Sequence, residues 1–333
     1  MESVTKHHIP KKYRILVTGA TGFIGRHLIS ELVGHAHVRT LVRTSSNIDH
    51  LKQYPNIEIV YGDLDTDKGL DNALVNIDSV IHCAARTNAV TYYEYYQTNT
   101  LGTLHLVQAM ERNAVKQILL LSTNAVSGPS PTKQPICEDE LPRPISYYGS
   151  TKKRAEDIVK KSGLNYIILR PVAVYGPFDM DMLRYIRLIA HGICPVIGFG
   201  EKYLNLIHVS DLVRLMLACI SKGSYDNETF FVHDGHCYQF TKVVQTISEI
   251  IGRSVRIIRI PKSIAMLYSI LNEIFIHPAK RLIRRDKIYE LACQYWLCST
   301  GNLFKKFDFQ PQFTLAQGMA NTIRWYKTHG FLP

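Results

Sequence analysis

Short runs of β-branched and apolar residues recur along the first half of the chain, separated by segments in which apolar residues return every three or four positions. The runs are typical of buried parallel strands, and the segments between them are typical of helices. Helices are indicated most clearly at 95–112 and 150–161. Strands that alternate with helices predict an α/β fold with a doubly wound parallel sheet. The six predicted strands lie at 13–17, 38–42, 57–61, 79–82, 117–121 and 165–169.

The stretch 18–25, TGATGFIG, joins the first predicted strand to the first predicted helix. At such a junction Gly19 permits a tight turn, Gly22 lets the backbone approach a pyrophosphate, and Gly25 lets helix and strand pack closely. The N–H groups and the dipole at the helix start favour phosphate. The motif therefore predicts a Rossmann-type dinucleotide site rather than a plain glycine-rich turn. The residues of the motif expected at the cofactor are Gly19, Thr21, Gly22, Phe23, Ile24 and Gly25.

Arg43 follows the second predicted strand, and hydroxyl residues occupy 44–46 behind it. An NAD-specific site places an acidic residue about 20 residues beyond the glycines, where it binds the ribose 2′-hydroxyl. A guanidinium and hydroxyls suit a 2′-phosphate instead. The sequence therefore favours NADP(H). NAD(H) is the alternative if Arg43 is merely a solvent-exposed arginine.

Residues after the third and fourth predicted strands are candidates for the rest of the cofactor. Asp63 could accept from the adenine amino group, and Leu64 could pack on the ring. The alternative for Asp63 is a turn or helix-capping aspartate. Ala84 and Ala85 have small side chains, as close approach of the backbone to a cofactor requires.

Tyr148 and Lys152 lie four residues apart in a predicted helix, so they share one face. An ammonium near a phenol favours the phenolate and lowers a pKa that is about 10 without it. A phenol tuned in this way can exchange a proton with a substrate oxygen near neutral pH. The spacing alone is common. It indicates an active site here because the pair follows the fifth strand of a nucleotide-binding sheet.

These motifs follow the order of the extended short-chain dehydrogenases/reductases, the NAD-dependent epimerase/dehydratase superfamily, which the chain resembles over nearly its whole length. TGATGFIG resembles the family's TGxxGxxG, Asp63 and Leu64 match its adenine contact, and Tyr148 and Lys152 match its YxxxK. Asn99 matches the active-site asparagine of the family, and Thr123 falls at its catalytic Ser/Thr position.

The resemblance implies a role for each matched residue. Tyr148 would be the acid/base, Thr123 would polarise the substrate oxygen, and Lys152 would also bind the nicotinamide ribose. Asn99 would hold a supporting water. Two further residues of the LRPVAVYGP run, Pro171 and Val174, are expected at the cofactor.

Two substitutions bear on the branch of the family. Members that act on nucleotide sugars carry an arginine where this chain has Leu204, and an asparagine where it has Ala173. Without both polar contacts a buried diphosphate would be poorly paired. The LRPVAVYGP and VRTLVR runs are more similar to the 3β-hydroxysteroid dehydrogenase and dihydroflavonol reductase branch. That likeness implies hydride transfer to or from a secondary alcohol or ketone of a bulky, rather apolar substrate.

Two other functions stay open. One is a nucleotide-sugar epimerase or dehydratase with tightly bound NAD. The other is a non-catalytic cofactor-binding protein, although such a protein need not keep Thr123, Tyr148, Lys152 and Asn99 together.

The chain of 333 residues is expected to have a disordered tail at 1–12, a cofactor-binding domain at 13–172 and a smaller substrate-binding lobe at 173–333. Residues 203–233 of the lobe are expected to return to the sheet. Substrate specificity would come from 92–96, 173–182 and the chain beyond 192. By analogy with the family, the helices at 95–112 and 150–161 would form a homodimer interface.

Positive charge is concentrated in the lobe, because 253–287 contains nine Lys or Arg residues against two acidic ones, within a net charge of +11. No nucleic-acid recognition signature accompanies it, so no nucleic-acid partner is predicted. The apolar segment 264–276 precedes part of this charge and is too short to span a bilayer. It is either a helix buried in the lobe or part of a peripheral membrane contact formed by 262–285.

The remaining signals concern compartment and metal. The N-terminus lacks the apolar core of a signal peptide, and the seven cysteines form no CxxC pair, so we expect a cytoplasmic protein with membrane association as the alternative. The histidines show no metal-ligand spacing, so no metal site is predicted.

Overall fold

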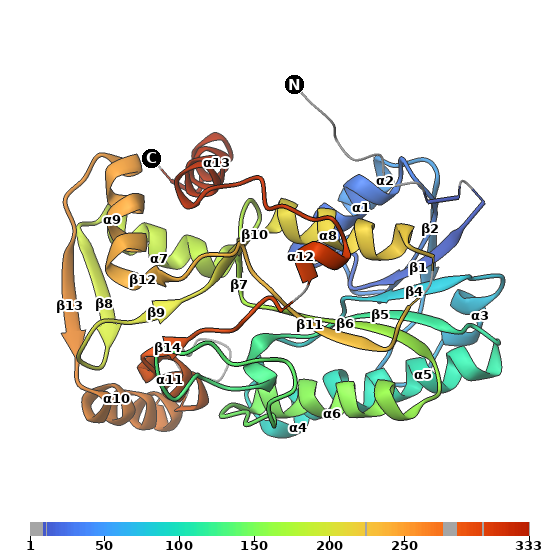
Figure 1. Cartoon of the computed structure of the whole chain (residues 1–333), viewed down its shortest axis with the longest axis horizontal. Helices are drawn as coiled ribbons and strands as arrows, with labels where there is room; N and C mark the ends of the chain where they lie inside the picture. The colour runs from blue at the N-terminus through green and yellow to red at the C-terminus, as the bar shows by residue number, and fades with distance from the viewer. Residues whose placement is uncertain (1–8, 11, 224, 276–284, 302, 333) are drawn as a thin grey trace.

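A seven-stranded parallel sheet forms the centre of the molecule (Figure 1), in a computed structural model that describes residues 9–10, 12–223, 225–275, 285–301 and 303–332. The strand order is β11-β6-β5-β4-β1-β2-β3, and every neighbouring pair is parallel. The strands are β1 (Arg14–Thr18), β2 (His37–Val42), β3 (Ile57–Tyr61), β4 (Ser79–His82), β5 (Gln117–Leu121), β6 (Asn165–Pro171) and β11 (Glu228–Val232). The predicted doubly wound α/β fold is confirmed.

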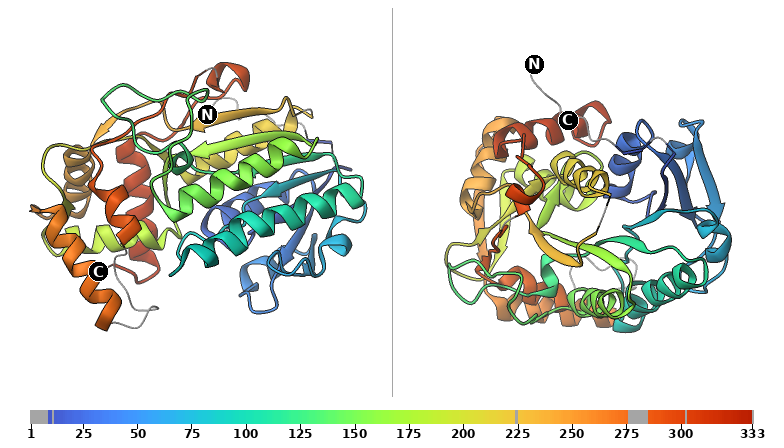
Figure 2. Two further views of the ribbon diagram at one scale, coloured as in Figure 1. Left: turned by 90° about the horizontal axis from the view of Figure 1, so that it is seen from below. Right: turned by 45° about the vertical axis from the view of Figure 1, so that its right-hand side comes forward.

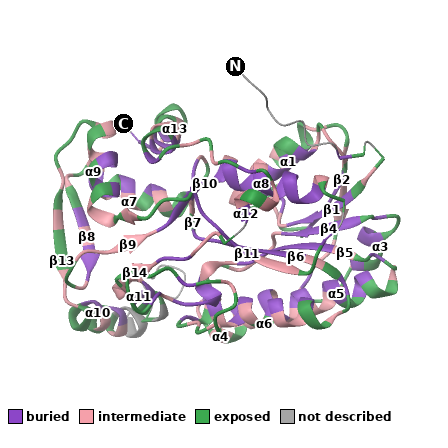
Figure 3. Ribbon diagram, viewed as in Figure 1, coloured by how far each residue is buried: buried purple, intermediate pink, exposed green. Residues whose placement is uncertain are grey.

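Helices cover both faces of this sheet, which is why the central strands β1, β4 and β5 are almost wholly buried, whereas the edge strand β3 is partly exposed (Figure 3). Alternate residues of a strand point to opposite faces, so Leu119 of β5 packs in one core and Leu120 in the other. One face packs against α1 (Phe23–Leu32) and α8 (Val209–Ser221). The other packs against α3 (Leu70–Leu74), α5 (Gly102–Arg112) and α6 (Tyr147–Lys161). Helices α5 and α6 run side by side on the lower surface (Figure 2).

Two helices begin earlier than their apolar periodicity predicts. The helix expected from residue 95 begins with α4 (Tyr92–Tyr95) and continues through a π-helical stretch, η1 (Tyr96–Leu101), into α5. Thr91 and Glu94 form a capping box at its start. Helix α6 begins at Tyr147 rather than at 150, because the Ser146 side chain caps it by accepting from the Gly149 N–H. Polar caps, not apolar residues, set both starts.

The C-terminal lobe has cores of its own. One packs helices α7 and α9 against α13, and a smaller one joins α10 to α11 and β8. The remaining elements are α2 (Asp49–Lys52), η2 (Asn124–Val126), β7 (Ala173–Tyr175), α7 (Met180–Ala190), β8 (Ile193–Ile197), β9 (Tyr203–Leu204), β10 (Leu206–His208), β12 (Tyr238–Gln239), α9 (Phe240–Ile251), β13 (Arg256–Ile260), α10 (Lys262–Phe275), α11 (Arg285–Ala292), β14 (Tyr295–Trp296), α12 (Leu303–Lys306) and α13 (Leu315–Thr328).

Some sequence expectations fall partly outside the described residues. Of the expected tail, only residues 9, 10 and 12 are described, and the basic residues at 280–284 are not. Within the described part of the chain, no helix is both long and apolar enough to cross a bilayer. The same residues contain no cluster of three or more His, Cys, Asp or Glu side chains arranged to hold a metal ion.

Candidate active site

The glycine-rich turn has the geometry of a phosphate cradle. Gly19 has a φ of +77°, and a Cβ there would lie 2.6 Å from the Ala84 nitrogen. A Cβ on Gly25 would lie 2.1 Å from the Gly19 carbonyl oxygen. Both positions therefore require glycine. Gly22 precedes α1, and no side chain caps that helix, so the N–H groups of its first turn are available to an anion. These features fit a dinucleotide pyrophosphate.

Basic side chains surround this turn. Arg43 is exposed directly after β2, and it makes no ion pair or side-chain hydrogen bond with the residues that the structure describes. Arg26, in α1, donates to the Thr21 carbonyl at 3.3 Å. His50 hydrogen-bonds the Ala20 carbonyl at 3.1 Å. Arg26 and His50 were not singled out in the sequence; Arg26 directly follows the motif, whereas only the fold brings His50 to the turn.

Asp63 forms a turn after β3. Its Oδ1 accepts from the Asp65 N–H at 3.0 Å, which is the turn aspartate that the sequence left open as an alternative. Its other carboxylate oxygen has no such bond among the described residues, so an adenine contact stays a prediction. Leu64 is buried in the sheet core.

Asn99 is buried in the π-helical stretch, and hydrogen bonds hold its side chain in place. Its amide donates to the Arg86 carbonyl and to Thr151 Oγ1, both at 3.1 Å, and its Oδ1 accepts from the Arg86 N–H at 2.7 Å. The Thr151 hydroxyl in turn contacts the Tyr148 carbonyl at 3.0 Å. Asn99 therefore joins the loop after β4 to the helix of Tyr148. A bound water, which the resemblance implied, stays a prediction.

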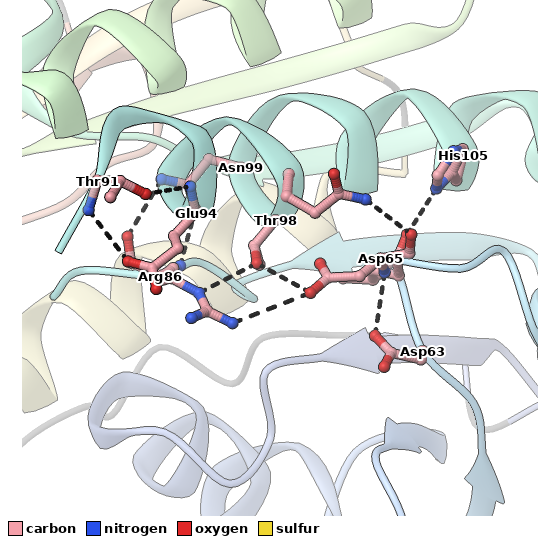
Figure 4. Close-up of polar contacts among 10 residues, drawn as sticks. Asp63, Asp65, Arg86, Thr91, Glu94, Thr98, Asn99 and His105 are labelled. Carbon is pink, nitrogen blue, oxygen red and sulfur yellow. Dashed lines mark hydrogen bonds and ion pairs between the residues drawn. The ribbon is translucent and has the colours of Figure 1, made fainter. Parts of the chain in front are cut away.

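The same stretch is tied to the turn after β3 (Figure 4). The Arg86 guanidinium lies 3.9 Å from the Asp65 carboxylate and donates to Thr98 Oγ1 at 3.3 Å. Thr98 itself donates to Asp65 at 3.3 Å. This network connects the candidate adenine turn of Asp63 with the helix that carries Asn99.

Thr123 and Tyr148 meet at the carboxyl end of the sheet. Thr123 follows β5, and Tyr148 lies in the first turn of α6. The Thr123 hydroxyl lies close enough to the phenol to lower the phenol pKa. Burial and the nearby Glu290 and Tyr95 act in the opposite direction and prevail, so the pKa of Tyr148 is raised.

Lys152 does not tune the phenol in the way the helical spacing predicted. Its ammonium donates to the Leu121 carbonyl at 2.9 Å, and the side chain is 1% exposed. Burial lowers the pKa of Lys152 to about 8. The expected lowering of the Tyr148 pKa is therefore wrong, because burial of the phenol, together with Glu290 and Tyr95, outweighs the lowering by Thr123.

Glu290 and Tyr95 reach the phenol without having been predicted individually as active-site residues. Glu290, in α11, is 8% exposed. Its Oε2 lies 2.7 Å from the Lys287 ammonium, and its Oε1 is buried with no hydrogen-bond partner among the described residues. The Tyr95 ring lies 6.3 Å from the Tyr148 ring. No local motif marks Glu290, which enters the site only through the packing of the lobe.

The four tyrosines of 92–96 divide between the site and the surface. Tyr95 is buried against Tyr148, whereas Tyr93 is exposed. Tyr92 stacks on Tyr96 and meets Tyr147 edge to face. Tyr95 is thus the member of the group whose ring packs against that of the candidate proton donor.

The other predicted cofactor residues lie at neighbouring strand ends. Ala84 and Ala85 follow β4, and the Ala84 N–H donates to Thr18 Oγ1 at 3.4 Å. Pro171 ends β6, and Val174 lies in β7. Because β1, β4 and β6 are parallel strands of one sheet, Ala84, Ala85 and Pro171 lie at the carboxyl ends where the glycine-rich turn also lies.

The two positions that bear on substrate class contribute only apolar side chains. Ala173 begins β7 and is exposed, and Leu204 in β9 is half-buried between the register partners Tyr238 and Trp296. Neither residue can donate a hydrogen bond to a diphosphate through its side chain.

Comparisons with known proteins agree with this geometry. UDP-glucose 4-epimerase of Vibrio cholerae is 28% identical over 249 residues, which cover 70% of this chain and 74% of that protein. Ceramide reductase of Caulobacter vibrioides is 27% identical over 325 residues and 96% of both chains. The solved structure of MoeE5 in complex with UDP-glucuronic acid and NAD superposes with a TM-score of 0.76 at 25% identity, covering 95% of this chain and 99% of that chain.

A family model settles the broader assignment. Residues 15–232 match the model of the NAD dependent epimerase/dehydratase family, and this range holds the glycine-rich turn, Asn99, Thr123, Tyr148 and Lys152. The chain belongs to the NAD dependent epimerase/dehydratase family.

Proposed function

We propose that this protein is an NAD(P)(H)-dependent oxidoreductase that moves hydride to or from a secondary alcohol or ketone of a bulky, rather apolar substrate. The observation that carries the proposal is the placement of the Thr123 hydroxyl beside the Tyr148 phenol, at the carboxyl ends of the parallel strands, where the glycine-rich turn also lies. Two hydroxyls at that place can bind and protonate one substrate oxygen.

The residues divide the work of such a reaction. When bound, the nicotinamide supplies or accepts the hydride. Thr123 donates a hydrogen bond to the substrate oxygen, and Tyr148 gives a proton to that oxygen in reduction or takes one in oxidation. The raised pKa of Tyr148 keeps the phenol protonated near neutral pH, which suits the direction of reduction. Lys152, fixed on the Leu121 carbonyl, places a positive charge under the strand end, where it can bind a ribose hydroxyl.

The proposed substrate class is inferred from residues of the C-terminal lobe. Ala173 and Leu204 replace the two polar residues that hold the diphosphate in the nucleotide-sugar branch, which supports an apolar substrate. The likeness to a ceramide reductase over 96% of both chains supports a lipid-like ketone in particular. As part of this proposal, we assign the protein to the steroid dehydrogenase-like branch of the family.

NADP(H) is the cofactor that we propose, because Arg43, directly after β2, makes no ion pair with any described residue. The solved structure of MoeE5 carries NAD, so NAD(H) is the competing choice.

A mass spectrum of the small molecules released from the purified protein, with titrations of NADPH and NADH, gives the first test. Exchangeable binding that prefers NADPH, followed by NADPH oxidation with a long-chain or polycyclic ketone, is the expected result. Tyr148→Phe should then lower turnover by about a hundredfold or more with cofactor affinity kept. The exposed neighbour offers a matched control, Tyr147→Phe. Unchanged turnover in Tyr148→Phe would contradict the mechanism.

A nucleotide-sugar epimerase or dehydratase is the second candidate. The likeness to UDP-glucose 4-epimerase and to MoeE5 supports this chemistry more directly than it supports a reductase. In that case NAD stays tightly bound and is reduced and reoxidised within one turnover. Retained NAD, with no net absorbance change at 340 nm during turnover of a UDP-sugar, would select it over the first candidate.

A further inference from the structure

Helix α10 turns four of its large apolar side chains to solvent. Ile264 and Leu267 are each 57% exposed, and Tyr268 and Leu271 are each 45% exposed. Their spacing places all four on one side of the helix. The small residues Ala265 and Ser269 face the lobe instead and are buried. The expectation of a helix buried in the lobe is wrong for this outer side.

Neighbouring elements add further exposed aromatic side chains to this part of the lobe. Tyr289 of α11 is 46% exposed, and its ring lies 4.5 Å from the Lys262 ammonium at the start of α10. Phe199, after β8, is 65% exposed, and the carbonyl of the next residue, Gly200, accepts a hydrogen bond from the Arg259 guanidinium. Figures 1 and 2 place α10 at the outer rim of the lobe. We call the set Ile264, Leu267, Tyr268, Leu271, Tyr289 and Phe199 the α10 surface.

The chain around the α10 surface is basic. From Gly252 to Leu271 there are four basic residues and no acidic one. Three of them, Arg256, Arg259 and Lys262, lie on β13 or at the start of α10. A cationic border around exposed apolar groups attracts an anionic surface. It disfavours a second copy of the same surface, because a two-fold contact would bring the basic residues of both copies together.

We propose that the α10 surface docks on an anionic lipid membrane, with the apolar side chains of α10 inserted at the level of the headgroups. At 14 residues the helix is about 21 Å long, so it lies in the plane of the membrane and does not cross it. Tyr268 and Tyr289 have the amphipathic rings that favour this interface.

The α10 surface is also close to the site along α11. Tyr289 faces outward beside Lys262, and the next residue, Glu290, is buried and acts on the Tyr148 phenol. Docking would therefore bring the lobe side of the active site near the lipid. The docking itself is independent of the reaction, so its test needs no substrate.

Flotation of the full-length protein with vesicles tests the proposal. Vesicles of phosphatidylcholine alone are compared with vesicles that contain one third phosphatidylserine, at low and high salt. We expect binding to the anionic vesicles, weakened by salt. The double variant Leu267→Ser/Leu271→Ser should lower partitioning at least about tenfold. Val75→Ser, at a residue 48% exposed on the other domain, should leave it unchanged.

The charges form a second arm. Arg256→Gln and Lys262→Gln should each weaken binding to anionic vesicles about fivefold, whereas Arg324→Gln on α13 should not. Circular dichroism checks that each variant is folded. Absence of wild-type binding to anionic vesicles would overturn the proposal, and so would full binding by the double leucine variant. If the wild type is a dimer that does not bind vesicles, and the double variant is a monomer, the α10 surface is a contact between two copies of the chain instead.

Discussion

The Lys152 ammonium donates a 2.9 Å hydrogen bond to the Leu121 carbonyl, at the end of the strand that leads to Thr123. The lysine therefore fixes α6 to the sheet as well as carrying a charge. Because this contact offers only one carbonyl oxygen to a buried ammonium, burial dominates and the pKa of Lys152 falls from 10.5 to about 8.

This lowered pKa predicts a pH dependence of stability. Between about pH 8 and 10.5 the unfolded chain binds the lysine proton and the folded chain has lost it, so the free energy of unfolding rises with pH across this window. The difference of about 2.5 pKa units corresponds to a gain of about 3 kcal/mol. Denaturant unfolding of wild type and Lys152→Met at several pH values measures it. The gain should vanish in Lys152→Met and persist in Lys153→Met, at an exposed helix pair. If the free energy of unfolding changes with pH in the same way in wild type and in Lys152→Met, this account is refuted.

Glu290 acts on the protonation of Tyr148 from helix α11 of the lobe. Its carboxylate raises the phenol pKa, after burial as the larger cause. Glu290→Gln removes the charge at nearly constant volume, so the phenol pKa should fall. In the oxidation direction, where Tyr148 must accept a proton, the rising limb of the pH–rate profile should then move to lower pH. Glu249→Gln, at an exposed site on α9, should leave the profile in place. If the pH–rate profile of Glu290→Gln is unchanged, the Glu290 charge does not act on the pKa of the Tyr148 phenol.

Arg43 is the test of cofactor choice. Arg43→Asp replaces a guanidinium by an acceptor for the ribose 2′-hydroxyl. NADPH should bind about tenfold to a hundredfold more weakly, and the affinity for NADH should hold or rise. Fluorescence titration of both nucleotides measures the ratio. Arg324→Asp, an exposed change of equal charge, controls for net charge. A constant ratio in Arg43→Asp would remove the 2′-phosphate role from Arg43.

Gly25 should tolerate no side chain. In Gly25→Ala the new methyl group meets the Gly19 carbonyl oxygen at 2.1 Å, so the backbone of the turn must move. We expect a loss of about 3 kcal/mol or more in the free energy of unfolding, together with weaker cofactor binding. At Gly34 a Cβ would meet no atom closer than 3.9 Å, so Gly34→Ala is the matched control and should change stability little. Thermal unfolding compares the two, and equal melting temperatures would show that the turn adjusts freely.

Local pattern predicted the sheet well because each strand carries its own apolar run. The third, fourth and fifth strands begin and end at the predicted residues, and the first is displaced by one. The start of α6 was missed because Ser146 defines it through a cap outside the apolar period.

The site was harder to predict than the sheet. The Tyr148–Lys152 spacing located both residues on one helix, but it could not show that the Lys152 ammonium would bind the Leu121 carbonyl of another element. Glu290 is distant from Tyr148 in the sequence and has no motif, so only the packing of α11 brings it to the phenol. Burial in the folded protein, together with charges on separate elements, decides these pKa values, and one sequence gives neither.

Strand β11, at one edge of the sheet, limits where the chain can be truncated and delays completion of the sheet during synthesis. Strand β11 pairs with β6 along its whole length, yet α7, β8 and α8 come between the two in the chain. A ribosome must therefore make most of the elements that begin the lobe before the cofactor-binding sheet is complete. A fragment that ends at 172 would expose β6, with its apolar residues, as an open edge. Such an edge is prone to pair with other chains, so the fragment should aggregate rather than fold as an isolated nucleotide-binding domain.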